Sequence, residues 1–151
     1  VVYRYSPYQL EFYNYHLWIA KPHKILTETV YKHLKHTNLF QQVTLTVKEA
    51  IPDYEIDAMV QAIEEFDSET EWYAHLAMTF RVVDYKTRRV VWQYDFDRRK
   101  KVFHHDVIYV VRAISQILED EMAVVVKGAS EAISADLAAH DASAGAAPGT
   151  P

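Results

Sequence analysis

The sequence predicts an α+β fold, a two-layer sandwich in which a mostly antiparallel sheet of four to six strands carries two helices on one face. Apolar and polar residues alternate around 54–62, 72–82 and 90–96, and a period of two is typical of strands with one buried face. Apolar residues recur every three or four positions in 25–34 and 107–122, as in amphipathic helices. An apolar sheet face needs a covering layer, which these helices can supply.

Length and composition indicate one domain and exclude several classes of function. The chain has 151 residues, 50% of them hydrophobic, which is enough for a single core. A formal net charge of −5 gives no general attraction to nucleic acid, and the absence of cysteine excludes disulfides and thiolate chemistry. We expect the domain to cover 1–135. In 136–151 the residues are mostly Ala, Gly, Ser, Pro and Thr without apolar periodicity, which predicts a flexible tail.

The first forty residues predict two short extended pieces and a helix. Tyrosines alternate with other residues in Val1–Ser6, as in a strand, and Pro7 breaks it before a second extended piece. Pro22 suits the first turn of a helix, where its missing N–H costs nothing. The apolar stripe that follows predicts a helix, and Asn38 is a suitable left-handed residue to end it.

Four further strands are predicted between residues 43 and 96. Valine and leucine alternate with threonine in 43–47, and the three long segments described above follow. In the first of these the period of two holds as far as Ala62 and then shifts phase, which a β-bulge or the end of the strand near Ile63 would explain. Residues 84–89 predict a hairpin connection between the last two strands.

A second, longer helix is predicted after the last strand. Asp106 can cap its first turn, and the apolar stripe begins at Val107. Glycine is a poor helix former, so we place the helix end between Gly128 and Ser134.

Two pairs of histidines suggest a metal site, although neither pair predicts a complete one. His33 and His36 lie one helical turn apart, and His104 and His105 are adjacent. A structural site needs about four convergent ligands and a catalytic site three. Only two can be counted in each place, so we interpret them as solvated surface and expect no metal and no cofactor.

Glu55 and Asp57 share one face of a predicted strand, a spacing that suggests acid–base catalysis. Side chains two apart on one strand face lie about 7 Å from each other, close to the separation in paired-carboxylate glycosidases. Apolar residues alternate with both, and the solvent face of a sheet explains them equally well. We interpret them as surface residues and expect no catalytic residue.

Two segments are candidates for a partner interface. The most concentrated positive charge is the basic run formed by Arg98, Arg99, Lys100 and Lys101, which is either a solvated strand edge or a docking site. Aromatic residues gather at the beginning of the chain, where they either anchor the segment to the core or contact a partner. The candidates are Tyr3, Tyr5, Tyr8, Tyr13, Tyr15 and Trp18.

One pattern resembles a known family. The run consists of Ser6-Pro7-Tyr8, Tyr13, Tyr15, Trp18, Pro22, Leu26, Leu34 and Leu39-Phe40. This combination of tyrosines, a tryptophan, a helix started by proline and a Leu-Phe ending resembles the ABC-type transport auxiliary lipoprotein family. Alternating strands, a hairpin and a final helix follow in the same order as far as about residue 133.

The resemblance implies a non-enzymatic accessory subunit of a bacterial ABC system for intermembrane lipid transport. Its expected partner is a periplasmic mammalian-cell-entry (MCE) protein, with a ring of identical subunits as one form of assembly, and no nucleic acid is expected. Family members are held at the outer membrane by an acylated cysteine, which this chain lacks. Location in the periplasm and anchorage are therefore implied by the resemblance alone.

Three other functions stay open at this point. The domain could hold an acyl chain between sheet and helices, with the aromatic segment as a lid. It could be an enzyme that uses Glu55 and Asp57 or the histidine pairs. It could bind RNA through the basic run, in which case binding would depend steeply on salt.

Overall fold

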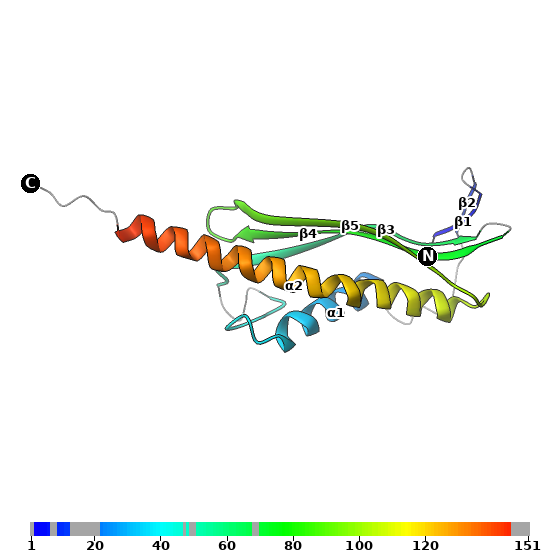
Figure 1. The fold of residues 1–151 in the computed structure, drawn as a ribbon, viewed down its shortest axis with the longest axis horizontal. Helices are drawn as coiled ribbons and strands as arrows, with labels where there is room; N and C mark the ends of the chain where they lie inside the picture. The colour runs from blue at the N-terminus through cyan, green and yellow to red at the C-terminus, as the bar shows by residue number, and fades with distance from the viewer. Residues whose placement is uncertain are drawn as a thin grey trace, which may run out of the picture.

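A computed structural model describes residues 2–6, 9–12, 22–46, 48, 51–67 and 70–145, with side chains described from residue 24 onward. Two helices and five strands follow one another along the chain (Figure 1). In chain order they are β1 (Val2–Ser6), β2 (Gln9–Phe12), α1 (Pro22–His36), β3 (Tyr54–Asp67), β4 (Trp72–Asp84), β5 (Val90–Lys101) and α2 (Val107–Gly145).

The strands form one sheet in the order β2-β1-β3-β4-β5. The three long strands β3, β4 and β5 pair antiparallel over most of their length, whereas β1 pairs parallel with the last residues of β3, Val2 opposite Glu64 and Arg4 opposite Phe66. The α+β class, the two helices and the antiparallel pairing of the long strands are as predicted. The parallel pairing of β1 was not predicted, since β1 carries no signal for its partner.

Both helices lie on the same side of the sheet, and α2 runs along the length of β4 and β5 (Figure 1). The core lies between them. The apolar stripe of α1, Leu26, Val30 and Leu34, is buried in this core as its spacing predicts. The centre of the core is formed by side chains from β4 and α2 that are at most 1% exposed, among them Leu76, Met78, Phe80, Leu118 and Met122.

A β-bulge in β3 explains the phase shift in the sequence. The register with β4 shifts between Val60 and Ala62, so that Gln61 is the extra residue. Beyond the bulge Ile63 packs against the core, and Glu64 lies on the opposite face, where it bonds to His75. Of the two explanations for the phase shift near Ile63, the bulge is therefore the correct one, and the strand does not end there but continues to Asp67.

Local bonds fix the predicted turns. The carboxylate of Asp84 accepts hydrogen bonds from the backbone N–H of Lys86 and Thr87 at 2.9 and 2.8 Å, which closes the hairpin between β4 and β5. Arg88 completes it with a φ of 61°, and Asn38 ends α1 with a φ of 54°, as predicted. The Asp106 carboxylate accepts from the N–H of Ile108 at 3.0 Å and caps α2.

Two predicted elements are wrong. Residues 42–46 form no strand, because the Thr44 hydroxyl bonds to the carbonyl and N–H of Thr46, at 2.7 and 3.0 Å, and so competes with strand pairing. Helix α2 does not end between Gly128 and Ser134 but runs to Gly145. The composition taken as a flexible tail is rich in alanine, which is also the best helix former. The predicted mobility of residues 136–151 stays a prediction.

Gly128 lies within α2 because a neighbouring ring needs its space. A Cβ atom at this position would overlap the indole of Trp92 on β5. Trp92 packs against the core cluster and stacks on Tyr94, with ring centroids 6.0 Å apart. The glycine therefore allows close contact between helix and sheet, at the expense of about 1 kcal/mol of helix propensity.

Gly128→Ala is expected to lower the free energy of unfolding by about 1–3 kcal/mol, since overpacking outweighs the gain in helix propensity. Urea denaturation measures it. Gly145→Ala is the matched control, because no atom lies within 4 Å of a Cβ there. A Gly128→Ala variant as stable as the wild type would mean that Trp92 does not restrict this position.

Candidate partner-binding surface

Arg98, the first member of the predicted basic run, is used within the domain. Its Nε lies 2.6 Å from Glu121 Oε1 on α2. The Tyr94 hydroxyl donates to the other Glu121 oxygen at 2.5 Å, and this hydrogen bond raises the pKa of Tyr94. Glu121 is 7% exposed, and a carboxylate so buried requires such partners. Arg98 therefore holds α2 to β5 through this ion pair, and 53% of its side chain is still exposed.

The other three members of the run differ in their surroundings. The Lys101 Nζ atom lies 3.4 Å from a carboxylate oxygen of Glu71, in the connection between β3 and β4. Within the described residues, Arg99 and Lys100 form no ion pair. Arg99 is exposed and Lys100 half-buried. The sequence alone could not show which of these four cations form ion pairs, because the partner carboxylates Glu121 and Glu71 lie on other elements.

The aromatic N-terminal candidates are only partly described. Tyr3 and Tyr5 belong to β1, whose backbone pairs with β2 and β3. The remaining candidates, Tyr8, Tyr13, Tyr15 and Trp18, lie outside the described residues. Their role as core anchors or as an interface therefore stays a prediction.

The histidine pairs do not converge on a metal. The Nδ1 of His33 bonds to a backbone carbonyl one turn earlier in α1, at 2.9 Å, and His36 is exposed. The ring of His104 lies against an aromatic ring of α2, and His105 stacks on Trp72 with centroids 4.6 Å apart. His33 is thus held by its own helix, and the rings of His104 and His105 are used in local packing.

Glu55 and Asp57 lie on the face of β3 away from the helices, as expected. Glu55 Oε2 lies 2.6 Å from an Nη1 atom of Arg88 in the β4–β5 hairpin. Asp57 lies opposite Arg81 of β4 in the strand register. Both residues are half-buried on this face of the sheet.

This outer face of the sheet carries a polar network that the sequence does not reveal. His75 on β4 bonds to Glu64 on β3 through Nδ1 at 2.5 Å, and to Asp97 on β5 through Nε2 at 2.8 Å. Nearby, the Thr79 hydroxyl donates to Asp95 at 2.5 Å and so lowers the pKa of that carboxyl. Both central residues are buried. The network ties the three long strands together.

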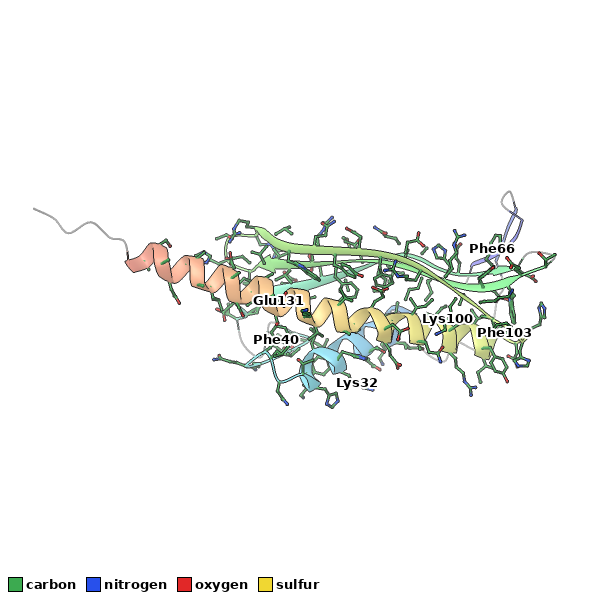
Figure 2. All side chains as sticks on the ribbon, viewed as in Figure 1. Lys32, Phe40, Phe66, Lys100, Phe103 and Glu131 are labelled. Carbon is green, nitrogen blue, oxygen red and sulfur yellow. The ribbon has the colours of Figure 1, made fainter. Side chains whose placement is uncertain are left out.

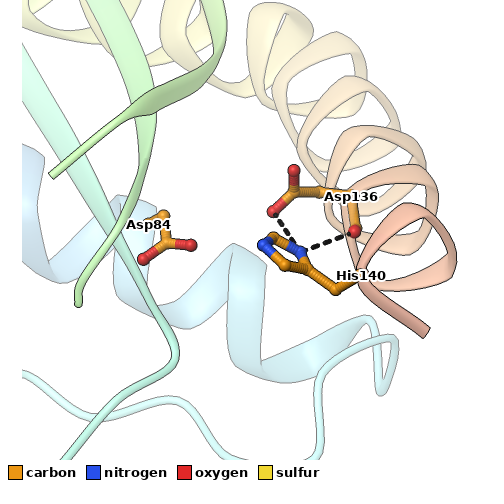
Figure 3. Close-up of side chains that lie close together, drawn as sticks. All are labelled: Asp84, Asp136 and His140. Carbon is orange, nitrogen blue, oxygen red and sulfur yellow. Dashed lines mark hydrogen bonds and ion pairs between the residues drawn. The ribbon is translucent and has the colours of Figure 1, made fainter. Parts of the chain in front are cut away.

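A cluster of potential metal ligands lies at the far end of α2 (Figure 3). Ligand atoms of Asp84, Asp136 and His140 lie within 4.8 Å of one another. Asp136 Oδ1 pairs with Arg89 at 2.5 Å, its Oδ2 accepts from the Tyr54 hydroxyl at 2.8 Å, and these bonds lower the pKa of its carboxyl. Both Asp136 oxygens thus already have protein donors. The cluster fastens the helix to the hairpin, and we assign it a structural role.

Tyr54→Phe is expected to change how stability depends on alkaline pH. Burial, and then the bond to Asp136, raise the pKa of Tyr54 from 10.0 to about 12 in the folded protein. The unfolded chain ionises first, so stability from this hydroxyl is complete below pH 10 and is lost as pH rises to about 12. Urea unfolding over this range should show the variant's stability falling less steeply than that of the wild type. Parallel curves for the two proteins would contradict the assignment.

Two solved structures share this fold. Protein XCC0632 from Xanthomonas campestris has a crystal structure that matches with a TM-score of 0.77 at 18% identity, over 90% of this chain and 77% of that one. The crystal structure of an uncharacterised protein matches with a TM-score of 0.58 at 15% identity, over 84% of this chain and 78% of that one. At these identities the matches show the fold alone. No curated protein matches the sequence.

The family is shown by the sequence itself. Residues 1–126 match the family described as "ABC-type transport auxiliary lipoprotein component", which is not an enzyme family. No helix among the described residues is long and apolar enough to cross a membrane. The match includes both candidate interface segments and the whole sheet. The chain therefore belongs to the family of ABC-type transport auxiliary lipoprotein components.

Proposed function

We propose that this protein is a non-enzymatic accessory subunit of a bacterial ABC and MCE system for intermembrane lipid transport. It docks the periplasmic assembly at the outer membrane through protein–protein contacts. The observation that carries the proposal is the family match over residues 1–126, since an auxiliary component of a transporter works by binding the transport machinery. A lipoprotein family belongs to the cell envelope, where such a contact can form.

The proposed contact to the MCE protein is the aromatic N-terminal segment. Tyrosine and tryptophan are the residues that most often dominate binding energy at protein interfaces. Strands β1 and β2 lie at one side of the sheet and near one end of the molecule (Figure 1), a position that a large partner can reach. Several copies of the chain around one partner, as a ring, would present this segment repeatedly.

The basic run contributes less to this contact than its sequence suggests. Arg98 and Lys101 are engaged with Glu121 and Glu71, so their replacement would disturb the domain as well as any complex. Arg99 and Lys100 are the members available to a molecule outside the chain.

The main rival, a module that holds an acyl chain between sheet and helices, has less support. Leu76, Phe80 and Met122 belong to one continuous packed cluster between β4 and α2 and are not exposed at all. An acyl chain at this place would have to displace them. Lipid recovered by extracting the purified protein would favour this rival.

The test is the native mass of the particle, by mass photometry, with and without the MCE protein encoded by the same organism. The proposal expects a defined complex, or a defined oligomer that the partner joins. A Tyr3→Ser/Tyr5→Ser/Tyr15→Ser variant should bind the partner about 30-fold more weakly, the effect of losing roughly 2 kcal/mol at an interface hot spot. Leu39→Ser is the control, as Leu39 is 58% exposed and lies after α1. A monomer that ignores the partner would overturn the proposal.

A further inference from the structure

The most exposed aromatic side chain among the described core and surface residues is Phe103, which is 80% exposed. It lies in the connection between β5 and α2, at the end of the molecule (Figure 2). Val102 before it is buried and donates its N–H to the Trp72 carbonyl at 2.8 Å. His105 after it stacks on the Trp72 ring with an interplanar angle of 12°. The loop is thus fixed on both sides, and Phe103 is held away from the core.

Two more exposed apolar residues follow it closely along the chain, on the first turn of α2. Ile108 is 50% exposed and Tyr109 38%. The Asp106 cap holds this turn through the N–H of Ile108, and the Tyr109 N–H bonds to the Asp106 carbonyl at 3.0 Å. We call Phe103, Ile108 and Tyr109 the tip. Single exposed apolar residues are ordinary, but a fixed group of large ones marks an interaction site.

The segment of the chain that contains the tip is rich in positive charge, in a protein that is negative overall. Residues 98–112 contain five of the 16 Lys and Arg residues and one of the 21 Asp and Glu residues. That one acid, Asp106, is used as the helix cap. The Arg112 guanidinium lies 5.6 Å from the centroid of the Tyr109 ring, which adds it to the two available cations Arg99 and Lys100.

Acidic residues of the neighbouring strand end and connection are engaged with other groups where their partners are described. Glu65 accepts a hydrogen bond from the indole N–H of Trp72 at 2.5 Å. Glu71 is engaged by Lys101 and by the Tyr73 hydroxyl, and these two hydrogen bonds lower the pKa of its carboxyl. The negative charge of Glu71 therefore offsets the positive charge of Lys101. Arg99, Lys100 and Arg112 stay uncompensated by any ion pair within the described part of the chain.

We propose that the tip inserts into the headgroup layer of a membrane that contains anionic phospholipid. Exposed aromatic and aliphatic groups surrounded by Lys and Arg are the composition of interfacial membrane contacts. Each cation near such a surface contributes about 1 kcal/mol. A protruding side chain suits a fluid lipid layer, which needs no matching pocket. Arg99 and Lys100 thereby bind lipid phosphate rather than the MCE protein.

The inference goes beyond the proposed function and does not depend on the MCE partner. Strand β1 pairs with the end of β3 at residues 64–66, next to the connection that leads to β4. Figure 1 shows β1 at the same end of the molecule as the beginning of α2. A lipid anchor before β1 and the tip would therefore contact one membrane, with the long axis of the domain directed away from it.

Vesicle flotation tests the inference without any partner protein. The chain is mixed with vesicles of phosphatidylcholine, with or without phosphatidylglycerol. We expect binding to the anionic vesicles, reduced about tenfold in Phe103→Ala because the burial of a phenylalanine side chain is lost. Ile51→Ala is the matched control, since Ile51 is 82% exposed and precedes β3 at the opposite end. Binding should weaken as salt rises from about 0.1 M to about 1 M, where screening shortens the Debye length to roughly 3 Å.

A second variant reports directly on insertion. In Phe103→Trp, the additional tryptophan emission should be quenched by brominated lipid tails, compared with the wild-type signal. Failure of the wild type to bind anionic vesicles, or equal binding by Phe103→Ala, would overturn the inference. If Phe103→Ala instead weakened only the complex with the MCE protein, the tip would belong to a protein interface. Loss of the MCE complex alone, with vesicle binding intact, would overturn the proposed function and leave this inference standing.

Discussion

Phe80→Ala is expected to lower the free energy of unfolding by about 3–5 kcal/mol, the usual cost of removing a buried phenylalanine ring. Phe80 lies in β4, the central long strand, and is 0% exposed. Its ring lies 6.3 Å from that of Phe96 on β5, beneath α2. The neighbours on both flanking strands are held by backbone pairing, so they cannot close the cavity. Urea denaturation at neutral pH, with the midpoint and slope compared with the wild type, gives the value.

Phe103→Ala provides the matched control for this measurement. It is the same chemical change at a side chain that is 80% exposed, and it should alter stability by less than about 0.5 kcal/mol. Equal losses in the two variants would mean that Phe80 does not lie at the centre of the core. A fall in the slope for Phe80→Ala would show that the variant has also lost cooperative unfolding.

The long strands were predictable because their side chains alternate over many residues. The period of two survives even where β3 bulges, since Ile63 and Glu64 exchange faces together and the shift can be seen in the sequence. A short element contains too few residues for alternation alone to identify it. Residues 43–47 also alternate, but threonine hydroxyls that bond to the local backbone can outweigh three apolar residues without a cross-strand partner.

The end of α2 shows a second limit. Alanine-rich composition has two physical interpretations, since it lacks the apolar surface for a core yet favours a helix. Which one applies depends on a tertiary contact. Asp136 is fixed by Arg89 and Tyr54, so the helix is held to the sheet well beyond Gly128. Asp136 and His140 are four residues apart, so they share one face of a helix. The sequence analysis did not use this spacing because it ended the helix before residue 136.

The candidate surfaces could be found in the sequence only as regions. The basic run is visible as four successive cations, but whether each is available depends on residues 20 to 30 positions away, such as Glu121 and Glu71. The exposure of Phe103 could not be predicted from the sequence. A single apolar residue between a strand and a helix belongs to no periodic pattern, and such a residue is usually buried. The exposure of Phe103 follows from the way that Val102 and His105 are both fixed on Trp72.

His75 offers the sharpest test of the outer face of the sheet. His75→Ala is expected to lower the free energy of unfolding by about 1–3 kcal/mol, the usual cost of taking a hydrogen-bond partner from a buried polar group. The His75 and Glu64 side chains are 9% and 12% exposed, so removing the ring leaves a carboxylate in a poorly solvated place. Thermal and urea unfolding measure the loss. A matched control is Asp97→Ala, which removes the bond to the other ring nitrogen. Asp97 is 69% exposed, and water can replace its partner, so the expected cost is below about 1 kcal/mol.

The two ring nitrogens of His75 have different partners, the buried Glu64 and the exposed Asp97. Further variants show how the bond to Glu64 contributes to stability. If the cost arises from the loss of the His75 bond to the Glu64 carboxylate, then adding Glu64→Gln to His75→Ala should recover at least about 1 kcal/mol, since burying a neutral amide costs far less than burying a carboxylate. If it arises from lost packing around the ring, the second substitution should restore nothing and His75→Phe should be tolerated. Equal costs for His75→Ala and Asp97→Ala would contradict the burial argument, because the loss of a bond to an exposed carboxylate would then cost as much as the loss of a bond to a buried one. The comparison therefore shows whether His75 stabilises the fold through its bond to Glu64 on β3 or through the packing of its ring.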